Sequence, residues 1–301
     1  MSALETNPET KLKNMMKFLT SNRDFNEGFT ARWNLTKKSR KLVVWIPIRQ
    51  YFGLFNTYRK LMTGVDVKIV LERGIHKDSI LTTENDEFKV KFHNLSLWLP
   101  HVELETEARV DYEATISKDM ELTWESIRVV RSNIQNTSSG NITVHTCSNE
   151  LAGIYVVPML AEKRENYKSN NMTFDNLNLR QCHVRVNNMR YPDEAYVANF
   201  GKNDQSYARF YHDFLASGKK TESTEIGSLV SYKDYASLYP VIYFAVGNHK
   251  YFTGMASLTV DFSWDLREAP DKEYVFFFIL VEKRKAVMNM ERKSFETLKT
   301  L

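Results

Sequence analysis

The chain has 301 residues, of which 43% are hydrophobic and 13% aromatic, so it can bury a large core and is not intrinsically disordered. Its two cysteines, Cys147 and Cys182, are too few for a disulfide framework or a metal cluster, and we expect both to be buried, reduced thiols. No apolar run approaches the ~18 residues of a membrane-spanning helix, and the N-terminus lacks the apolar stretch of a signal peptide. We therefore expect a protein that is neither secreted nor embedded in a membrane.

The net charge of +4 is unevenly distributed along the chain. Residues 11–41 carry nine lysines and arginines against two acidic residues, and residues 282–301 carry six against three. We expect residues 1–40 to form a basic segment with a short helix near its start. Such a segment predicts non-specific contact with nucleic acid, and a solvated basic surface is the alternative. The candidate nucleic-acid contacts are Lys37, Lys38, Arg40 and Lys41.

From residue 41 onward the sequence predicts mostly strands. Apolar and polar residues alternate over 64–73 and 258–266, which is typical of strands with one buried face. Asn187 and Asn188 are placed for a tight hairpin turn. About ten strands without a regular strand–helix alternation favour an all-β fold of antiparallel sheets over a doubly wound fold. The segments expected to form strands are 41–52, 64–73, 88–100, 125–135, 141–147, 153–161, 177–192, 240–247, 258–266 and 274–281.

One helix is expected within this run of strands, over residues 203–217. Asn203 or Asp204 can cap its start, and four aromatic residues recur at the i, i+3, i+4, i+7 spacing of one helix face. We expect this face to dock the helix onto the sheets. The docking residues are Tyr207, Phe210, Tyr211 and Phe214.

The last two strands differ in their need for burial. Residues 258–266 have one apolar and one polar face, whereas residues 274–281 are apolar on both faces, and the short polar loop between them predicts a hairpin. Burying a large apolar side chain is worth about 1.5–3 kcal/mol, so leaving a set of four exposed would forfeit several kcal/mol. We therefore expect the second apolar set to contact a further layer of protein. This set is Val275, Phe277, Ile279 and Val281.

The sequence shows no pattern of catalytic residues. Its seven histidines do not occur at metal-binding spacings, and it lacks a glycine-rich phosphate loop, a nucleophile elbow and a CxxC motif. His145 and Cys147 share a strand face, but we expect a core pair rather than a site. We thus expect no catalytic residue, no cofactor and no metal. An alternative is a sugar- or ligand-binding sandwich in which Trp45, Trp98 or Trp124 stacks on a ligand, although rings buried in the core or in a seam are expected.

Several short motifs follow one another from residue 26 onward. The first are Gly28-Phe29, Arg32, Ser39 and Pro47, followed by GVDVKIVLER and FKVKFHNLSLWL. The later ones are NMTFDNLNLRQCHVRVNNMRYP, NFGKNDQSYARFY and KDYASLYP. In content and order they resemble the double jelly-roll major capsid proteins of Polinton, or Maverick, elements and adintoviruses. The resemblance implies the subunit of an icosahedral shell, assembled in the cytoplasm or nucleus as a homo-oligomer, which is a trimer if it forms a capsomer.

The resemblance also implies a division of the chain. In the family about half of the first roll precedes the segment that matches residues 1–30 here. We therefore expect a partial first roll over 41–104, a complete second roll over 105–287 and a tail over 288–301. A second chain would supply the missing strands, or the protein would be a shortened or host-retained derivative. For the apolar set that begins at Val275, the resemblance favours the seam between the rolls over the helix or a neighbouring subunit.

Overall fold

The structure is a computed structural model that describes most of the chain from Val43 onward. The basic segment, with its expected helix and the candidate contacts Lys37, Lys38, Arg40 and Lys41, lies outside the described residues. The described residues are 43–58, 60–62, 66–75, 77, 91–116, 119–148, 150–201, 206–218, 230–247, 257–289 and 294–297.

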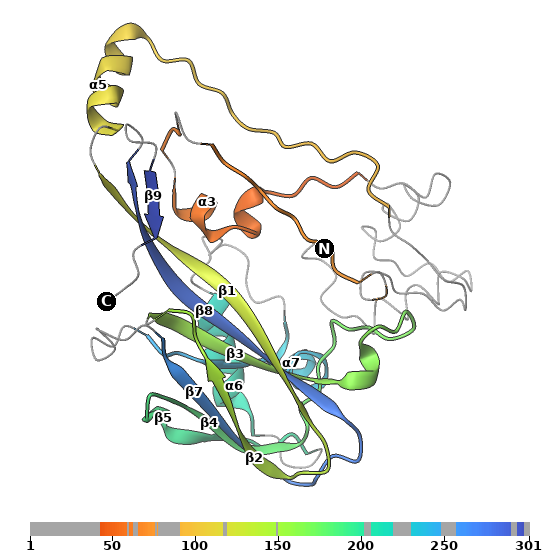
Figure 1. Ribbon diagram of the computed structural model, residues 1–301. Coiled ribbons are helices and arrows are strands. Elements are labelled where there is room, and N and C mark those ends of the chain that lie inside the picture. Colours follow the sequence, from red (N-terminus) through yellow and green to blue (C-terminus); the bar gives the residue numbers. More distant parts are fainter. Residues whose placement is uncertain are drawn as a thin grey trace.

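Two antiparallel sheets form most of the structure (Figure 1). One has the strand order β1-β8-β3-β6, with β9 paired to the end of β8, and the other has the order β2-β7-β4-β5. Eight strands in these two orders make a jelly roll. The all-β, antiparallel jelly-roll fold expected from the sequence is confirmed. The strands are β1 (Met120–Ile134), β2 (Ser139–His145), β3 (Leu151–Leu160), β4 (Leu179–Val186), β5 (Met189–Val197), β6 (Ile242–Phe244), β7 (Thr259–Leu266), β8 (Tyr274–Asn289) and β9 (Ser294–Thr297).

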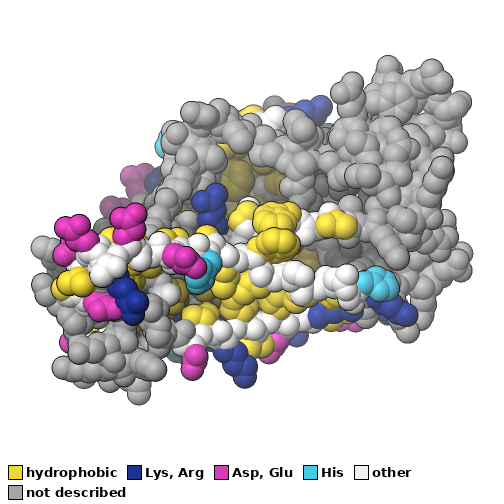
Figure 2. All heavy atoms as spheres, turned by 90° about the horizontal axis from the view of Figure 1, so that it is seen from above, with side chains coloured by type: hydrophobic (Ala, Val, Ile, Leu, Met, Phe, Trp, Pro, Cys, Tyr) yellow, Lys and Arg dark blue, Asp and Glu magenta, His cyan; other side chains and the backbone are white. Residues whose placement is uncertain are grey.

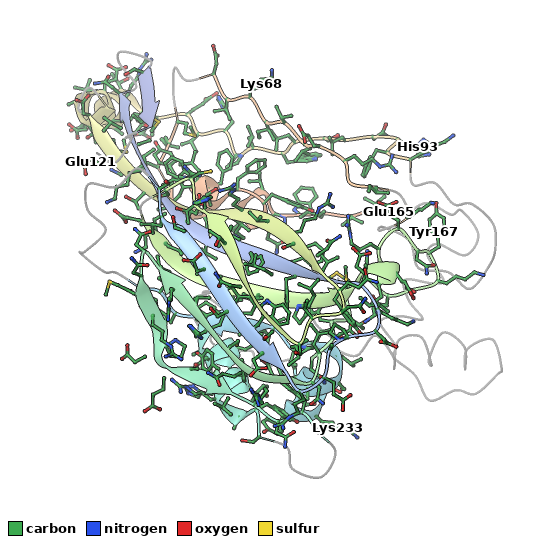
Figure 3. All side chains as sticks on the ribbon, turned by 60° about the horizontal axis from the view of Figure 1, so that its bottom comes forward. Lys68, His93, Glu121, Glu165, Tyr167 and Lys233 are labelled. Carbon is green, nitrogen blue, oxygen red and sulfur yellow. The ribbon has the colours of Figure 1, made fainter. Side chains whose placement is uncertain are left out.

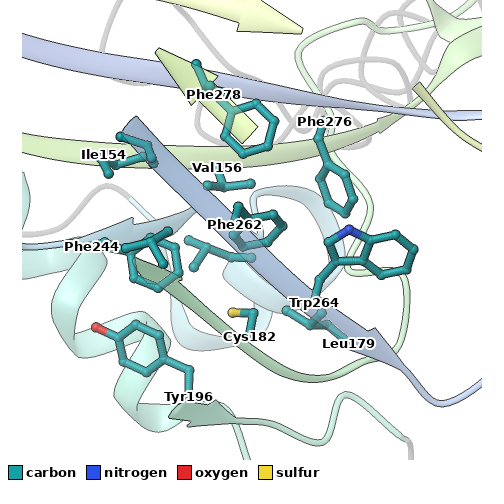
Figure 4. Close-up of a cluster of buried hydrophobic side chains, with 14 of the residues drawn as sticks. Ile154, Val156, Leu179, Cys182, Tyr196, Phe244, Phe262, Trp264, Phe276 and Phe278 are labelled. Carbon is teal, nitrogen blue, oxygen red and sulfur yellow. The ribbon is translucent and has the colours of Figure 1, made fainter. Parts of the chain in front are cut away.

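The core lies between the two sheets (Figure 4). The alternation along β7 produces this arrangement, because Val260, Phe262 and Trp264 are buried while the residues between them are only half-buried. The ring of Phe262 packs edge-on against the rings of Phe276 and Phe278 of β8, with centroids 5.4 and 5.6 Å apart. The apolar face of β7 is therefore one wall of the core, and alternate residues of β8 form the opposite wall.

β7 and β8 follow each other in the chain but do not form the expected hairpin. β7 pairs with β2 and β4, whereas β8 pairs with β1 and β3 of the other sheet. The loop 267–273 thus crosses from one sheet to the other. The hairpin prediction is wrong because a short polar loop between apolar runs serves such a crossover equally well. The outer faces of β7 and β8 therefore belong to different sheets, so one can be polar while the other is apolar.

The turn between β4 and β5 is the tight hairpin that the sequence predicts. Asn187 and Asn188 have φ angles of 45° and 71°, in the left-handed region that asparagine tolerates. Val186 and Met189 pair directly across the turn. The side chain of Asn187 accepts a hydrogen bond from the amide of Thr259 at 2.8 Å, which ties the hairpin to β7.

Short helices are inserted between the strands. The helix expected over 203–217 is observed as α6 (Ala208–Gly218), which begins later than expected, follows β5 and packs beside β6. The expected caps Asn203 and Asp204 lie outside the described residues. α7 (Tyr232–Leu238) comes next, and the Ser231 side chain caps it by accepting a hydrogen bond from the amide of Asp234. The other helices among the described residues are the 3-10 turns η1 (Ile48–Gln50) and η2 (Ala161–Lys163) and the α-helices α3 (Gly53–Thr57) and α5 (Thr106–Ile116).

The described residues between Val43 and Glu105, which we call the arm, contain no strand. The strands expected over 41–52, 64–73 and 88–100 are thus wrong wherever the structure describes these segments. The reason is that an extended segment becomes a strand only when a neighbouring strand satisfies its backbone N–H and C=O groups. The assignment of 41–104 to a partial first roll stays a prediction.

The arm is rich in exposed apolar side chains. Trp45 and Trp98 are each 73% exposed although their rings lie 5.8 Å apart, and Leu95 is 76% exposed. Elsewhere in the arm the guanidinium of Arg73 lies 5.2 Å from the ring centre of Phe92. Figure 2 looks onto this side of the molecule and shows hydrophobic side chains gathered in a band across it. Such a band is typical of a surface that another polypeptide covers.

α3 fixes the arm to the roll. Leu54 and Tyr58 pack on a small apolar cluster formed by Leu122 of β1 and Met288 of β8. A Cβ atom at Gly53 would overlap the carbonyl oxygen of Glu125. Only glycine therefore lets α3 lie against the backbone of β1 at this position.

Candidate assembly interface

The two sheets present different outer faces. On the outer face of β2-β7-β4-β5, polar side chains pair across the strands. The Thr143 hydroxyl donates a hydrogen bond to the Asp261 carboxylate at 2.6 Å, and the Ser263 hydroxyl donates one to Asn141 at 3.1 Å. Arg180 forms an ion pair with Asp265. Because these groups pair with each other and remain hydrated, this face needs no further cover.

The outer face of the sheet that contains β1, β8 and β3 is apolar. Ile127 lies directly opposite Val281, and Val129 lies opposite Ile279, so these four side chains share one face. Ile127 and Val129 are 68% and 57% exposed, whereas Ile279 and Val281 are half-buried. Phe277, next along β8 on the same face, is also half-buried. Three of the four residues expected to need a further layer thus line an incompletely covered face.

Two tyrosines extend this face toward β6. The rings of Tyr155 and Tyr243 lie 4.7 Å apart, and Tyr243 reaches across β3 above Gly153. A Cβ atom at Gly153 would lie 2.7 Å from the Tyr243 ring, so glycine makes room for it. Burial raises the pKa of Tyr243, and the carboxylates of Glu125 and Asp213 raise it further.

The loop between β3 and β4 covers one end of the outer face. The Asp175 carboxylate accepts hydrogen bonds from the Leu160 amide at 3.0 Å and from the Lys163 ammonium at 2.8 Å, and these bonds hold the loop against the sheet. Val275, the fourth residue of the predicted set, lies at this end and is 1% exposed. In Figure 3 the loop is marked by Glu165 and Tyr167, at the opposite end of the sheet from Glu121 of β1.

Between this loop and β1 the outer face forms a groove of about 290 Å³. Strands β1, β3 and β8 supply most of its lining, and the loop supplies the rest. Arg164 is the charged residue in the lining and Asn171 is the uncharged polar one. The apolar lining residues are Val129, Val157, Met159, Phe174, Phe277 and Ile279. An apolar groove next to exposed Ile127 is a surface suited to a protein partner.

Three of the residues predicted to dock the helix lie on α6, and Tyr207 directly precedes it. Tyr207 and Phe210 are 2% and 1% exposed within the core, and Tyr211 and Phe214 are half-buried against it. The Phe210 ring lies 4.8 Å from the ring of Tyr196. Because α6 packs beside β6 and into the core, the helix is not the layer over β8.

The polar groups around α6 support packing. The Tyr196 hydroxyl donates a hydrogen bond to the Asp213 carboxylate, and the Arg209 guanidinium lies 4.8 Å from the centre of the Tyr196 ring. Burial is the main reason that the pKa of Tyr196 is raised, and the bond to Asp213 raises it further. A phenol that keeps its proton and is already bonded is a structural anchor.

The structure places the remaining candidate residues apart. Cys182 is buried, and burial raises the pKa of its thiol, but Cys147 and His145 are exposed. The expectation of two buried thiols is wrong for Cys147 because it lies in the turn after β2. Among the described residues, no group of three histidine, cysteine or acidic side chains could hold a metal. None of the described helices is long and apolar enough to cross a membrane.

The tryptophans proposed as ligand-stacking residues fall into two groups. Trp45 and Trp98 are exposed side by side in the arm, so they are not core residues, and their expected place in a seam stays a prediction. Trp124 packs against the cluster that anchors α3. The candidate nucleic-acid contacts around Lys38 are outside the described residues, so they stay a prediction.

Ile127 and Val129 are exposed apolar residues of this candidate interface that sequence reasoning missed. They alternate with Arg128 and Val130 in the sequence, so both faces of the strand contain apolar residues. The signal that identifies them is their pairing with β8, which becomes visible only in the folded sheet.

Comparison with known proteins places the chain among double jelly rolls. The sequence matches the family described as "Double jelly roll-like domain" over residues 9–286. The mavirus major capsid protein is 12% identical, with a TM-score of 0.34 over 61% of this chain and 42% of that chain. A chain of the Sputnik virophage structure is 9% identical, with a TM-score of 0.34 over 60% of this chain and 39% of that chain. The chain thus spans about two fifths of these two proteins. No curated protein sequence matches it.

Proposed function

The chain belongs to the double jelly roll-like domain family, and from this premise we propose that it is a capsid-type structural protein. Its work is to assemble with other protein chains through its surfaces, without catalysis and without a cofactor. The observation that carries the proposal is the outer face of the β1-β8-β3-β6 sheet, where exposed Ile127 and Val129 border an apolar groove. A jelly roll buries only the inner face of each sheet, so an apolar outer face serves contact with another layer.

We also propose a narrower relationship within this family. The order of the sequence motifs supports a relative of the Polinton, or Maverick, and adintovirus capsid proteins. On this proposal the chain resides in a virion shell that assembles in the cytoplasm or nucleus, and its capsomer is a trimer. The basic segment around Lys38 faces the nucleic acid inside the shell.

The arm supports a second kind of contact. Its exposed apolar side chains, among them Leu95, Leu97 and Leu99, alternate along a segment without ladder partners in the described part of the chain. Adding strands from another chain would satisfy its backbone and cover these side chains together. We propose that early strands of the first roll, carried by a separate chain, pair with the arm.

The test is the mass and shape of the purified chain. Sedimentation velocity and negative-stain electron microscopy should show trimers or larger shells whose assembly depends on concentration. Replacing Ile127 by Glu places a charge in the proposed interface and should shift the protein toward smaller species, whereas Lys233→Glu on α7, away from this face, should not (Figure 3). A monomer at all accessible concentrations would contradict the proposal.

The exposed pair of Trp45 and Trp98 favours one alternative, a jelly-roll domain that binds a carbohydrate or another flat ligand. Adjacent aromatic rings can stack on such ligands. Binding of the chain to a glycan panel, abolished by Trp98→Ala in a protein that stays monomeric, would support this alternative. A host-retained derivative would keep the fold and association without forming shells.

A further inference from the structure

The outer face of β1 carries a self-complementary pattern. At every second position the strand presents an acidic residue, two apolar residues and a basic residue, and all four side chains are exposed. These residues are Glu125, Ile127, Val129 and Arg131. They extend over about 20 Å of strand, which is long enough to span the centre of a protein interface. A second copy running in the opposite direction presents the same pattern reversed.

We propose that this face packs against the same face of a second copy of the chain. The two copies are related by a two-fold axis that lies between the packed sheets, runs across the strands and passes over Arg128 of β1. The inference rests on the proposed function and names the partner of the same surface. Glu125 then lies over Arg131 of the second copy, and Ile127 lies over Val129 of the second copy. Each contact occurs twice, because a two-fold interface uses the same patch on both chains.

The neighbouring strand fits the same axis. Opposite Glu125 and Arg131 on β8 stand Lys283 and Phe277, and opposite the two apolar residues of β1 stand Val281 and Ile279. The axis therefore brings Val281 over Ile279 of the second copy. It also brings the Lys283 ammonium over the Phe277 ring of the second copy, a favourable cation–π arrangement. Charged groups thus surround an apolar centre, which is the usual anatomy of a protein interface.

Packing of faces is favoured over pairing of edges. β1 is the edge strand of its sheet, but α3 already lies against its backbone at Glu125, where Gly53 makes the contact. Antiparallel edge pairing centred on Arg128 would need a different two-fold axis, perpendicular to the sheet, and would set Arg128 beside Arg128 of the second copy, where directly opposed like charges are destabilising. In face packing the Arg128 side chain stays on the inner side, where it donates a hydrogen bond to the carbonyl of His145.

A charge-exchange experiment on the full chain tests the arrangement. Glu125→Arg and Arg131→Glu each create two like-charge contacts and should weaken self-association by about tenfold or more in sedimentation equilibrium. The double variant restores two opposite-charge contacts and should associate within about threefold of the original chain. Glu121→Arg is the matched control, because Glu121 lies on the same exposed face of β1 but beyond the proposed contact. Circular dichroism verifies that each variant folds.

The outcomes separate this inference from the proposed function. A double variant that associates no better than the single variants would overturn the two-fold arrangement. If the charge variants all associate like the original chain while Ile127→Glu dissociates it, the face assembles in another geometry and only the inference fails. If Ile127→Glu also leaves association unchanged, the assembly role of this face is wrong as well.

Discussion

The fully buried carboxylate of Glu282 accepts a hydrogen bond from the backbone amide of Cys147 at 2.9 Å. Its other oxygen accepts a hydrogen bond from the Arg284 guanidinium at 2.7 Å, and the same guanidinium donates to the Cys147 carbonyl at 3.0 Å. Glu282 stands on β8 and Cys147 in the turn between β2 and β3, so this pair joins the two sheets where the turn crosses between them.

We expect Glu282→Ala to lower the free energy of unfolding by about 1–3 kcal/mol, because it removes the acceptor of the Cys147 amide and one of the two acceptors of the Arg284 guanidinium. Glu282→Gln should cost less, since its carbonyl can still accept from Cys147. Urea denaturation provides the measurement, and Glu268→Ala, an exposed carboxylate, is the control with a change within about 0.5 kcal/mol. Equal losses in the Ala variants of Glu282 and Glu268 would contradict the anchoring role.

The aromatic face of α6 provides a second prediction. Phe210 is 1% exposed and packs on Tyr196, so Phe210→Ala should cost about 3–5 kcal/mol of stability through the cavity it leaves. His212 lies on the same helix with a side chain that is 78% exposed, and His212→Ala should change stability by about 0.5 kcal/mol or less. A loss below about 1 kcal/mol for Phe210→Ala would show that the helix is not docked by this face.

Features set by neighbouring residues could be predicted from the sequence. The alternation over 258–266 identifies β7 (Thr259–Leu266), and Asn187-Asn188 identifies the turn between β4 and β5. The spacing of aromatic residues around Phe210 identifies α6. In each case a short stretch of chain decides the backbone conformation, and the rest of the fold only adds to it.

Features set by distant residues could not be predicted. The sequence shows that Phe277 and Ile279 need cover, but it does not show that β8 pairs with β1, which precedes it by more than a hundred residues. The apolar face that includes Ile127 exists only because of this pairing. The same limit explains the hairpin error, since the sheet to which a strand belongs depends on contacts across the whole domain.

Tyrosine ionisation should weaken the fold at alkaline pH. Burial, assisted by the Asp234 carboxylate, raises the pKa of Tyr239 to about 12. The folded chain therefore keeps a proton that the unfolded chain, with an ordinary tyrosine pKa of about 10, releases. Its contribution to stability is complete below about pH 10 and is lost as the pH rises through about 12.

Tyr239→Phe removes this ionisation and should make stability less dependent on pH in that range. Urea denaturation at a series of alkaline pH values is the measurement, and stability at neutral pH shows whether the ring still packs. A variant whose stability falls as steeply as that of the original chain would mean that Tyr239 does not contribute. Tyr235 should still contribute to the decline, because burial raises its pKa as well.

The basic segment should bind nucleic acid weakly and without sequence preference. Binding measured against rising salt should weaken linearly on a double-logarithmic plot, because Lys and Arg release counterions from phosphates. Exchanging Lys37, Lys38, Arg40 and Lys41 for Glu should lower both the affinity and the salt slope. Affinity that stays constant between low and physiological salt would exclude this mechanism.

Limited proteolysis should distinguish the arm from the roll. Strands β1 to β8 hold one another in two hydrogen-bonded sheets, so local opening there requires the loss of many contacts. The described residues between Val43 and Glu105 contain no strand, and large side chains such as Leu95 and Trp98 are exposed. Opening of the arm therefore costs little, and first cleavage should fall before about residue 100 and leave a fragment that contains β1 to β8. Association with a chain that adds strands to the arm should protect the same sites. An arm that outlasts the sheets during digestion would show that the more stable unit of this protein lies in its N-terminal third.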